Sequence, residues 1–193
     1  MAVKNTGATA LKFKQPSHII ATLFTGSEAE GEEAAGDSFI LETVVRDTTS
    51  VTQDDPETTD IECETSDSPI DSVTKLGKYQ FNTEVADTQE ELVTALMGWK
   101  KSGTKVVAPA GYVEKFVKVD IVFVDTKNST QETTKYIAFT IPRLKLNSKL
   151  MLESMNSNIA RVNLAGTAFD WKVGTDTTPF YMDTDYTVPT SKA

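Results

Sequence analysis

Carboxylates are the most abundant side chains in this sequence with the potential for chemistry. The 193 residues include 28 acids against 19 lysines and arginines, a formal net charge of -9. Two close pairs, Asp54 with Asp55 and Asp183 with Asp185, have the groups needed for calcium binding or acid–base catalysis. Neither pair has a full ligand spacing, and chance pairs are expected among so many surface acids. The acids therefore do not predict a catalytic or metal site.

The other residue types that often carry chemistry are scarce. His18 is the only histidine and has no cysteine near it in sequence, so neither a zinc site nor a histidine-dependent triad is predicted. Cys63 is the only cysteine, which excludes a disulfide within the chain and favours folding inside the cell. No phosphate-binding glycine loop is present. We expect a protein that is not an enzyme and that uses no cofactor or metal.

The charge and hydropathy patterns restrict the partners. Binding to the outside of nucleic acid or to an anionic membrane needs clustered lysine and arginine, which an acidic chain of this kind does not offer. The early apolar stretch from Ile19 to Phe24 is too short for a signal core or a membrane span. We predict a soluble protein that is not secreted by this route, and whose contact with DNA, if any, is non-adhesive.

The elements that position these residues are mostly strands. Threonine, valine and isoleucine are frequent, and this composition favours strands. Alternating apolar residues predict strands at 39–46, 79–85, 112–125, 136–146 and 159–173. In the fourth of these, a proline followed by a phase slip predicts a bulge or an edge strand.

One stretch, at about 88–101, predicts a helix. Asp87 is a suitable N-cap with Glu90 three residues later, and apolar residues recur at helical spacing until Gly103. Amphipathic surface helices normally pack their apolar stripe on the body, so we expect Leu96 to be buried.

The segment Asp47–Glu64 alternates like a strand but consists mostly of threonine and acid. Its sequence is DTTSVTQDDPETTDIECE, with a turn signal in the middle. We predict a long hairpin that projects from the body. Its predicted tip consists of Asp54, Asp55, Pro56 and Glu57.

The return strand of this hairpin is predicted to have two different faces. Strict alternation puts Ile61 and Cys63 toward the body and Asp60, Glu62 and Glu64 on the opposite face. An acidic face would repel DNA phosphates at short range. The alternative is a solvated outer face, which is common on soluble sandwiches.

The chain is predicted to be a single domain of the mainly β class. It divides into an N-terminal arm at 1–25, an acidic loop at 26–37, a β-sandwich with the flanking helix at 38–173, and a C-terminal arm at 174–193. The loop GSEAEGEEAAGD cannot bury apolar area, so it is predicted to be mobile or ordered by a partner, and the alternative is an ordinary solvated acidic loop. Polar arms of this kind are ordered when neighbours pack on them.

This order of elements resembles that of the tail tube proteins of siphophages and myophages. The residues that carry the likeness best are VVRDTTSVTQDDPETTDIECETSDSPI at 44–70. LMGW at 96–99, AGY at 110–112 and LAGTA at 164–168 support it. The likeness covers most of 39–171.

The resemblance implies a β-sandwich with one flanking helix, a long projecting hairpin and extended terminal arms. Such subunits form rings, expected to be hexameric, whose inner sheets join into a β-barrel around a DNA channel. The rings stack into a tube through the hairpin and the arms. Asp60, Glu62 and Glu64 are then candidates to face the lumen, and the predicted hairpin tip is a candidate ring-stacking contact.

The resemblance also implies partners and a location. The partners are further copies of the chain, the other tail proteins (terminator, baseplate or tip, and tape measure) and passing double-stranded DNA without specific binding, with no membrane. The location is the virion tail, after assembly in the host bacterial cytoplasm. Three alternatives stay open: a head decoration protein, a tail terminator, and an adhesion or carbohydrate-binding sandwich. The long polar hairpin argues against decoration, and the missing signal argues against the adhesin.

Overall fold

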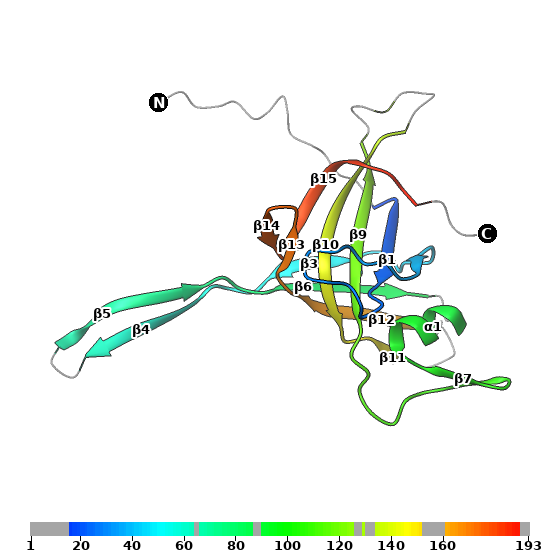
Figure 1. The fold of residues 1–193 in the computed structure, drawn as a ribbon, viewed down its shortest axis with the longest axis horizontal. Coiled ribbons are helices and arrows are strands. Elements are labelled where there is room, and N and C mark those ends of the chain that lie inside the picture. Colours follow the sequence, from blue (N-terminus) through cyan, green and yellow to red (C-terminus); the bar gives the residue numbers. More distant parts are fainter. Residues whose placement is uncertain are drawn as a thin grey trace.

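The computed structural model describes residues 16–63, 66–86, 90–125, 129, 134–151 and 161–189. These residues lie mostly in antiparallel strands, and the described part contains one short helix (Figure 1). In chain order the strands are β1 (His18–Leu23), β2 (Ser38–Ile40), β3 (Ser50–Gln53), β4 (Glu57–Cys63), β5 (Ser66–Lys75), β6 (Tyr79–Val85), β7 (Lys100–Ser102), β8 (Lys105–Val107), β9 (Phe116–Val124), β10 (Tyr136–Leu146), β11 (Lys149–Met151), β12 (Arg161–Ala168), β13 (Trp171–Val173), β14 (Asp176–Thr178) and β15 (Tyr181–Tyr186), and the helix α1 is Glu90–Met97. The predicted mainly β class is confirmed.

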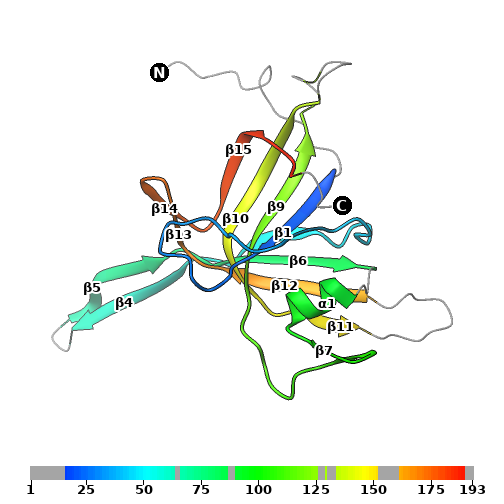
Figure 2. The same cartoon turned by 45° about the vertical axis from the view of Figure 1, so that its right-hand side comes forward.

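The body is built on one nine-stranded sheet. Its strand order is β2-β1-β9-β10-β12-β6-β3, and β11 pairs with β12 while β15 pairs with β10. β10 pairs with β9 along most of its length, with β15 over its first half and with β12 over its last residues. In both views β1, β9, β10 and β15 run steeply while β6 and β12 run across them (Figures 1 and 2). The sheet therefore changes direction at β10 and forms two crossing layers.

The change of direction coincides with the predicted irregularity at Pro142. The register between β10 and β9 shifts between Ile141 and Leu144. Proline has no N–H to donate to the ladder, so it is accommodated where pairing is interrupted. Of the two predicted alternatives, the bulge is correct, because β10 has neighbours on both sides.

Other strand boundaries differ from the alternation pattern. β6 matches the predicted strand at 79–85, but the strand predicted at 39–46 shortens to β2. The strand predicted at 112–125 begins only at Phe116, and the one at 159–173 divides into β12 and β13. The boundaries differ because alternation indicates only which residues face the core, whereas hydrogen bonding to a neighbouring strand determines where each strand ends.

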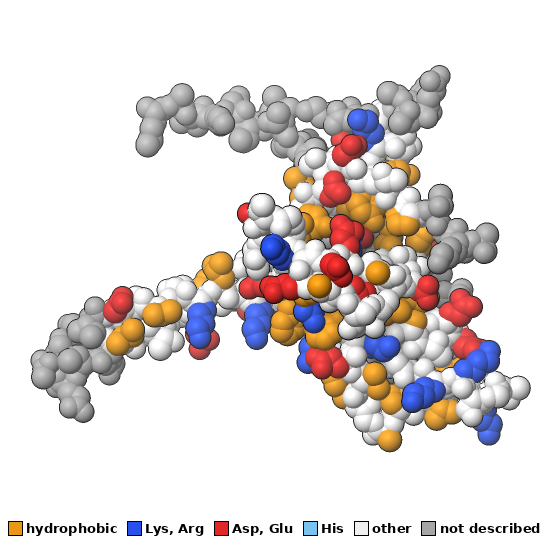
Figure 3. All heavy atoms as spheres, in the orientation of Figure 1, with side chains coloured by type: hydrophobic (Ala, Val, Ile, Leu, Met, Phe, Trp, Pro, Cys, Tyr) orange, Lys and Arg blue, Asp and Glu red, His pale blue; other side chains and the backbone are white. Residues whose placement is uncertain are grey.

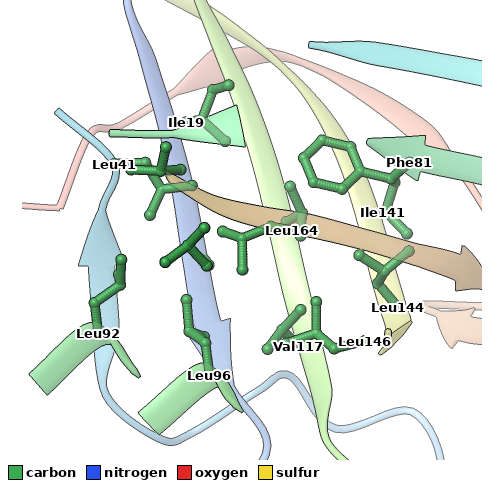
Figure 4. Packing of buried hydrophobic residues seen from close by; sticks show 14 of the residues in the cluster. Ile19, Leu41, Phe81, Leu92, Leu96, Val117, Ile141, Leu144, Leu146 and Leu164 are labelled. Carbon is green, nitrogen blue, oxygen red and sulfur yellow. The ribbon is translucent and has the colours of Figure 1, made fainter. Parts of the chain in front are cut away.

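The main core lies between the crossing layers and beneath the helix (Figure 4). Each strand contributes alternate residues: Val117, Val119 and Ile121 of β9 are buried, as are Val162 and Leu164 of β12. Alternation predicts that Val117, Val119 and Ile121 face inward, which is confirmed, and also that Val113 does, which is wrong because Val113 is 38% exposed.

The helix closes one end of this core. Leu96 is 1% exposed, as expected for the apolar stripe, and Figure 4 shows it pointing at the same cluster as Val117. The helix ends before Gly98, whose φ of +69° suits glycine, and not at Gly103 as predicted. Asp87, the predicted N-cap, lies outside the described residues. In the described part of the chain, no helix is long and apolar enough to cross a membrane.

Both predicted arms contain strands that belong to the body. β1 lies within the predicted arm at 1–25, pairs with β9 and contributes the fully buried Ile20. β14 and β15 lie within the predicted arm at 174–193, and β15 pairs with β10. These segments are short, so their strand character depends on partners far away in sequence. Residues 1–15 and 190–193 lie outside the described ranges.

A second, smaller apolar cluster lies on the opposite face of the β1–β9–β10 layer. Ile20, Val122 and Ala138 are 0% exposed there, and Tyr186 and Val188 from the C-terminal segment pack against them. The C-terminal segment therefore covers a sheet face that would otherwise expose apolar residues to water.

Candidate functional site

The most prominent feature outside the body is the hairpin of β4 and β5, which extends away from the crossing layers (Figures 1 and 2). A projecting hairpin was predicted, but its tip was predicted in the wrong place. β3 belongs to the main sheet through its pairing with β6, and β4 pairs with β5. The base of the hairpin, where the chain leaves the sheet, contains Asp54, Asp55, Pro56 and Glu57. The turn signal therefore marks a strand exit, because it interrupts pairing at that point.

Close backbone contacts hold this base together. The Asp54 N–H donates to the Lys78 carbonyl oxygen over 2.9 Å, and the Gln80 side chain donates to the Asp54 carboxylate over 3.1 Å. A Cβ atom at Gly77 would lie 1.7 Å from the Asp54 carbonyl oxygen, so only glycine allows this approach. The direction in which the hairpin leaves the body is thereby restricted.

The two faces of the hairpin differ in chemistry. One face carries the two apolar residues of the described part, Ile61 at 42% and Val73 at 48% exposed. The register places them there together with Glu57, Thr59, Asp71 and Lys75. The opposite face is polar and consists of Thr58, Asp60, Ser72 and Thr74 in its described part. Ile61 was predicted to pack against the body, and this is wrong, because the hairpin projects into solvent (Figure 3).

The candidate lumen acids are only partly described. Asp60 is exposed on the polar face opposite Ser72. The backbone of Glu62 belongs to β4, but its side chain and that of Cys63 lie outside the described parts, as does all of Glu64. The register shifts between Ile61 and Cys63, so strict alternation does not continue to the end of the strand. The lumen assignment of these acids stays a prediction.

The acidic loop at 26–37 is organised by its own carboxylates. Glu28 accepts hydrogen bonds from the backbone N–H groups of Thr25, Gly26 and Ala35 over 2.7, 2.8 and 3.2 Å. These bonds, that from Thr25 first, hold the pKa of Glu28 at about 2, well below its usual 4.5.

Contacts with the body fix the same loop from outside. The indole N–H of Trp171 donates to the Glu32 carbonyl oxygen over 2.9 Å, and Glu33 lies 3.6 Å from the Lys118 ammonium. The chain itself therefore supplies contacts for this loop, and most of its residues are exposed, as in a solvated acidic loop.

A buried carboxylate connects three strands on the outer face of the β1–β9–β10 layer. Asp120 of β9 is 2% exposed. Thr140 of β10 donates to one of its oxygens over 2.6 Å, and Tyr186 of β15 donates to the other over 3.0 Å. The Lys118 ammonium lies 3.7 Å from it. We call these four residues the Asp120 network; it ties β15 to the sheet.

Burial dominates the electrostatics of this network. Burial raises the pKa of Asp120 despite the nearby Lys118 charge and the two hydroxyl donors. Burial lowers the pKa of Lys118, but the negative charges around it, Asp120 first, outweigh this and raise it overall. Burial and the Asp120 charge raise the pKa of Tyr186, so Tyr186 remains a donor at neutral pH. Ionisation of Asp120 therefore opposes folding. The free energy of unfolding is higher while Asp120 is protonated, and it falls as the pH rises from the unfolded-state pKa through the folded-state pKa of Asp120.

The outer face of the β12–β6 pair is polar and internally satisfied. Side-chain hydrogen bonds of 2.9 Å cross it from Arg161 to Glu84, from Asn163 to Asn82, and from Thr167 to Gln80. We call this set the polar ladder. Its donors and acceptors are paired within the chain, which leaves little free charge for a polyanion to bind.

The remaining candidates for chemistry do not come together. His18 contacts Tyr136 edge-on with ring centres 6.2 Å apart, and its Nδ1 lies 3.1 Å from the Ser17 hydroxyl. Asp183 accepts from the Asp185 N–H over 3.0 Å, a local turn contact. Among the described residues, no group of three or more histidine, cysteine, aspartate or glutamate side chains could hold a metal ion.

The described surface includes a small hollow and a larger one. One of about 70 Å³ lies beside Lys118, Trp171 and Tyr181 and is far smaller than the volume that a drug-sized ligand occupies. The other, of about 560 Å³, is polar and open and is lined by residues such as His18 and Arg46. Neither has the mostly apolar, enclosed lining that is typical of a small-molecule site.

Sequence reasoning missed the Asp120 network. An acid within the strand VKVDIVFV was a signal, but Asp120 has the parity of the outward face, where an acid normally needs no explanation. Its burial depends on Tyr186, which the sequence placed in an arm.

No protein-family model matches this sequence, and no curated protein matches it. Sequence pattern and geometry therefore carry the functional proposal.

Proposed function

We propose that this chain is a structural protein that assembles into stacked rings, expected to be hexameric, and so forms the tail tube of a tailed bacteriophage. Support comes from the order of elements that resembles the tail tube family, and from a mainly β body with one flanking helix and a projecting hairpin. The tube would serve as the conduit for genome delivery.

The observation that carries the proposal is the unsupported hairpin. An isolated two-stranded hairpin is marginally stable in water, because few apolar contacts offset the entropy of ordering its backbone. Here Ile61 and Val73 are about half exposed on one face. A neighbouring copy that covered Ile61 and Val73 would supply the apolar contacts that the hairpin lacks in the single chain.

The geometry of such a contact favours an open assembly. The β4–β5 hairpin leaves one side of the body, whereas the hairpin on the other side, β7–β8, is a short one with three residues in each strand (Figure 1). A contact between two different patches is head-to-tail and generates rings or filaments, whereas a self-complementary patch generates closed dimers.

The charge of the chain suits a conduit for DNA. A net charge of -9 disfavours adhesion to phosphates, and basic walls would bind DNA by releasing its counterions. We keep Asp60, Glu62 and Glu64 as candidate lumen acids. The polar ladder is a second candidate surface, because its charged members are already paired.

The proposal is tested with the purified chain at high concentration. Native mass spectrometry and negative-stain electron microscopy are expected to show rings and tubes. A shortened variant, with residues 57–75 replaced by a short Gly-Ser turn, should keep the fold of the body because Asp54 and Lys78 already close the base. We expect this variant to lose tubes.

The outcomes separate the competing functions. A strict monomer by both methods would contradict self-assembly. Rings that never stack would favour a tail terminator, and tubes formed by the shortened variant would show that the hairpin does not mediate stacking.

The lumen assignment is tested in a functional phage. Lysine at Asp60, Glu62 and Glu64 together should leave tubes intact but slow genome release, most at low salt where charges are least screened. Release at the normal rate at every ionic strength, or a tube reconstruction with these side chains outside, would show that the assignment is wrong.

A further inference from the structure

Arg143, in the bulge of β10, lies against three aromatic rings, Phe24, Phe116 and Trp171, that we call the aromatic cage. Its guanidinium carbon lies 4.3 Å from the ring centre of Phe116 and 4.5 Å from that of Trp171. Phe24 is 6.0 Å away, and Phe169 contacts Phe116 edge-on at 6.2 Å. Stacked rings hold the planar guanidinium in a defined orientation.

The cation in this cage has no counter-ion within the described chain. Lys118, Lys145 and Arg161 each lie within 4.0 Å of a carboxylate, whereas no described acid lies that close to Arg143. Its Nε is buried without a hydrogen-bond partner in the described residues. Its Nη groups have no partner there either and are not buried, so they remain open to an outside acceptor.

The surroundings of Arg143 have the composition of an interface centre. Phe169 is 43% exposed beside it, and Trp171 is 8% exposed. Arginine and large aromatic residues are enriched at the energetic centres of protein interfaces, where apolar neighbours exclude water from a charged contact. An isolated cation here would gain most from a carboxylate, which accepts two parallel hydrogen bonds from a guanidinium.

A matching carboxylate lies on the hairpin face that carries Ile61 and Val73. Asp71 is exposed, faces Ile61 across the two strands, and precedes Val73 on the same face by two residues. A carboxylate between two apolar side chains complements a guanidinium between aromatic rings. Asp60, on the polar face of the same hairpin, has no such neighbours.

We propose that the aromatic cage with Arg143 is the docking site for the β4–β5 hairpin of a second copy, with Asp71 as the carboxylate that pairs with Arg143. This inference rests on the proposed self-assembly and names the contact that makes it. A phosphate of DNA is the less suitable occupant, because polyanion binding uses several exposed cations and the cage presents a single recessed one.

A double-mutant cycle tests the pairing. The variants are Arg143→Met, which keeps an apolar stem over the rings, Asp71→Asn, and the two combined. The measured quantity is the protein concentration at which half of the chain sediments as tubes. Each single substitution should raise this concentration at least about tenfold, as expected for truncating one partner of a desolvated charge pair. The double variant should need no higher protein concentration for half-sedimentation than the single variant that assembles less well.

Matched controls keep the result interpretable. Asp60→Asn removes the same charge from the opposite hairpin face and should change the concentration less than about twofold, the range of an exposed rim charge. The melting temperature of each variant shows whether the body folds. If Arg143→Met fails to fold, Arg143→Lys keeps the charge but loses the paired hydrogen bonds, and Asp71→Asn still decides the question from the exposed hairpin.

The outcomes that overturn the proposal are distinct. If the wild type assembles but Asp71→Asn assembles equally well, or if the two substitutions add without coupling, this contact is wrong and self-assembly stands. If Arg143→Met assembles normally but loses binding to a short DNA duplex at low salt, the cage is a phosphate site and the proposal fails. A wild type that never assembles overturns both proposals.

Discussion

Removal of one hydroxyl group tests the Asp120 network. In Tyr186→Phe, the buried Asp120 carboxylate loses one of its two hydroxyl donors, at 3.0 Å, and keeps Thr140 at 2.6 Å and Lys118 at 3.7 Å. The ring of Tyr186 stays, so the packing over the smaller apolar cluster is preserved. The substitution therefore isolates a single hydrogen bond to a buried charge.

The magnitude follows from that environment. Hydrogen bonds to charged groups contribute about 1.5–3 kcal/mol, and Asp120 is 2% exposed, so water cannot replace the lost donor without rearrangement. We expect the free energy of unfolding at pH 7 to fall by about 2 kcal/mol. For a chain of this size that corresponds to a decrease in melting temperature of about 4–8 °C.

The pH dependence gives a second, independent prediction. The Tyr186 hydroxyl lowers the pKa of Asp120, so its removal raises that pKa further above the unfolded value of 3.8. Asp120 then has one folded-state pKa in the wild type and a higher one in the variant. By linkage, the variant loses stability more steeply than the wild type as the pH rises from the first of these values to the second. The destabilisation should therefore shrink to about 1 kcal/mol below the folded-state pKa of Asp120, where the bond becomes one between neutral groups.

The assay is urea unfolding at several pH values, with Tyr136→Phe as the matched control. Tyr136 pairs with Tyr186 across β10 and β15, and its hydroxyl has no hydrogen bond within the described residues. The control should change stability by less than about 0.5 kcal/mol. Equal stabilities of the two variants, or a Tyr186→Phe effect that does not change with pH, would refute the network as described.

Three further substitutions probe other parts of the structure. Leu96→Asp puts a charge at a position that is 1% exposed, so it should cost several kcal/mol, on the order of 4, or prevent folding; a soluble variant with an unchanged melting temperature would show that the helix stripe is not buried. Gly77→Ala places a Cβ atom 1.7 Å from the Asp54 carbonyl oxygen, so the backbone must shift at the hairpin base; amide exchange should rise in β4 and β5, and unaltered exchange would contradict the close approach. Glu28→Gln removes a carboxylate whose pKa is lowered to about 2. The ionised carboxylate stabilises the loop above pH 4.5, and this contribution is lost as the pH falls toward 2. The wild-type loop should therefore loosen over that range, as measured by Trp171 fluorescence, and the variant should show no such transition.

Local sequence patterns were sufficient to predict the mainly β class and the inward-facing residues of β9 and of the helix. Alternation identified Val117, Val119 and Ile121 of β9 as inward, and helical spacing identified Leu96, because both periods are properties of neighbouring residues along one strand or helix. The phase slip at Pro142 likewise located the bulge of β10. Threonine and acid in alternation indicated a projecting hairpin, since such a strand cannot bury enough apolar surface within the body.

Long-range pairing decided the features that these patterns missed. The short runs at β1 and β15 resembled arms, and they became strands only because His18 pairs with Val122 and Tyr181 with Thr140. The same turn signal that suggested a hairpin tip marks the exit from the sheet, because β3 pairs with β6 in the main sheet and not with β4. Asp120 has the parity of an outward-facing residue, and it is buried only because strands from distant parts of the chain cover it. Arg143 likewise meets the rings of Phe24 and Trp171 only through long-range packing. Hydrogen bonding between strands carries no signature within either strand, so only the tertiary structure sets which residues meet.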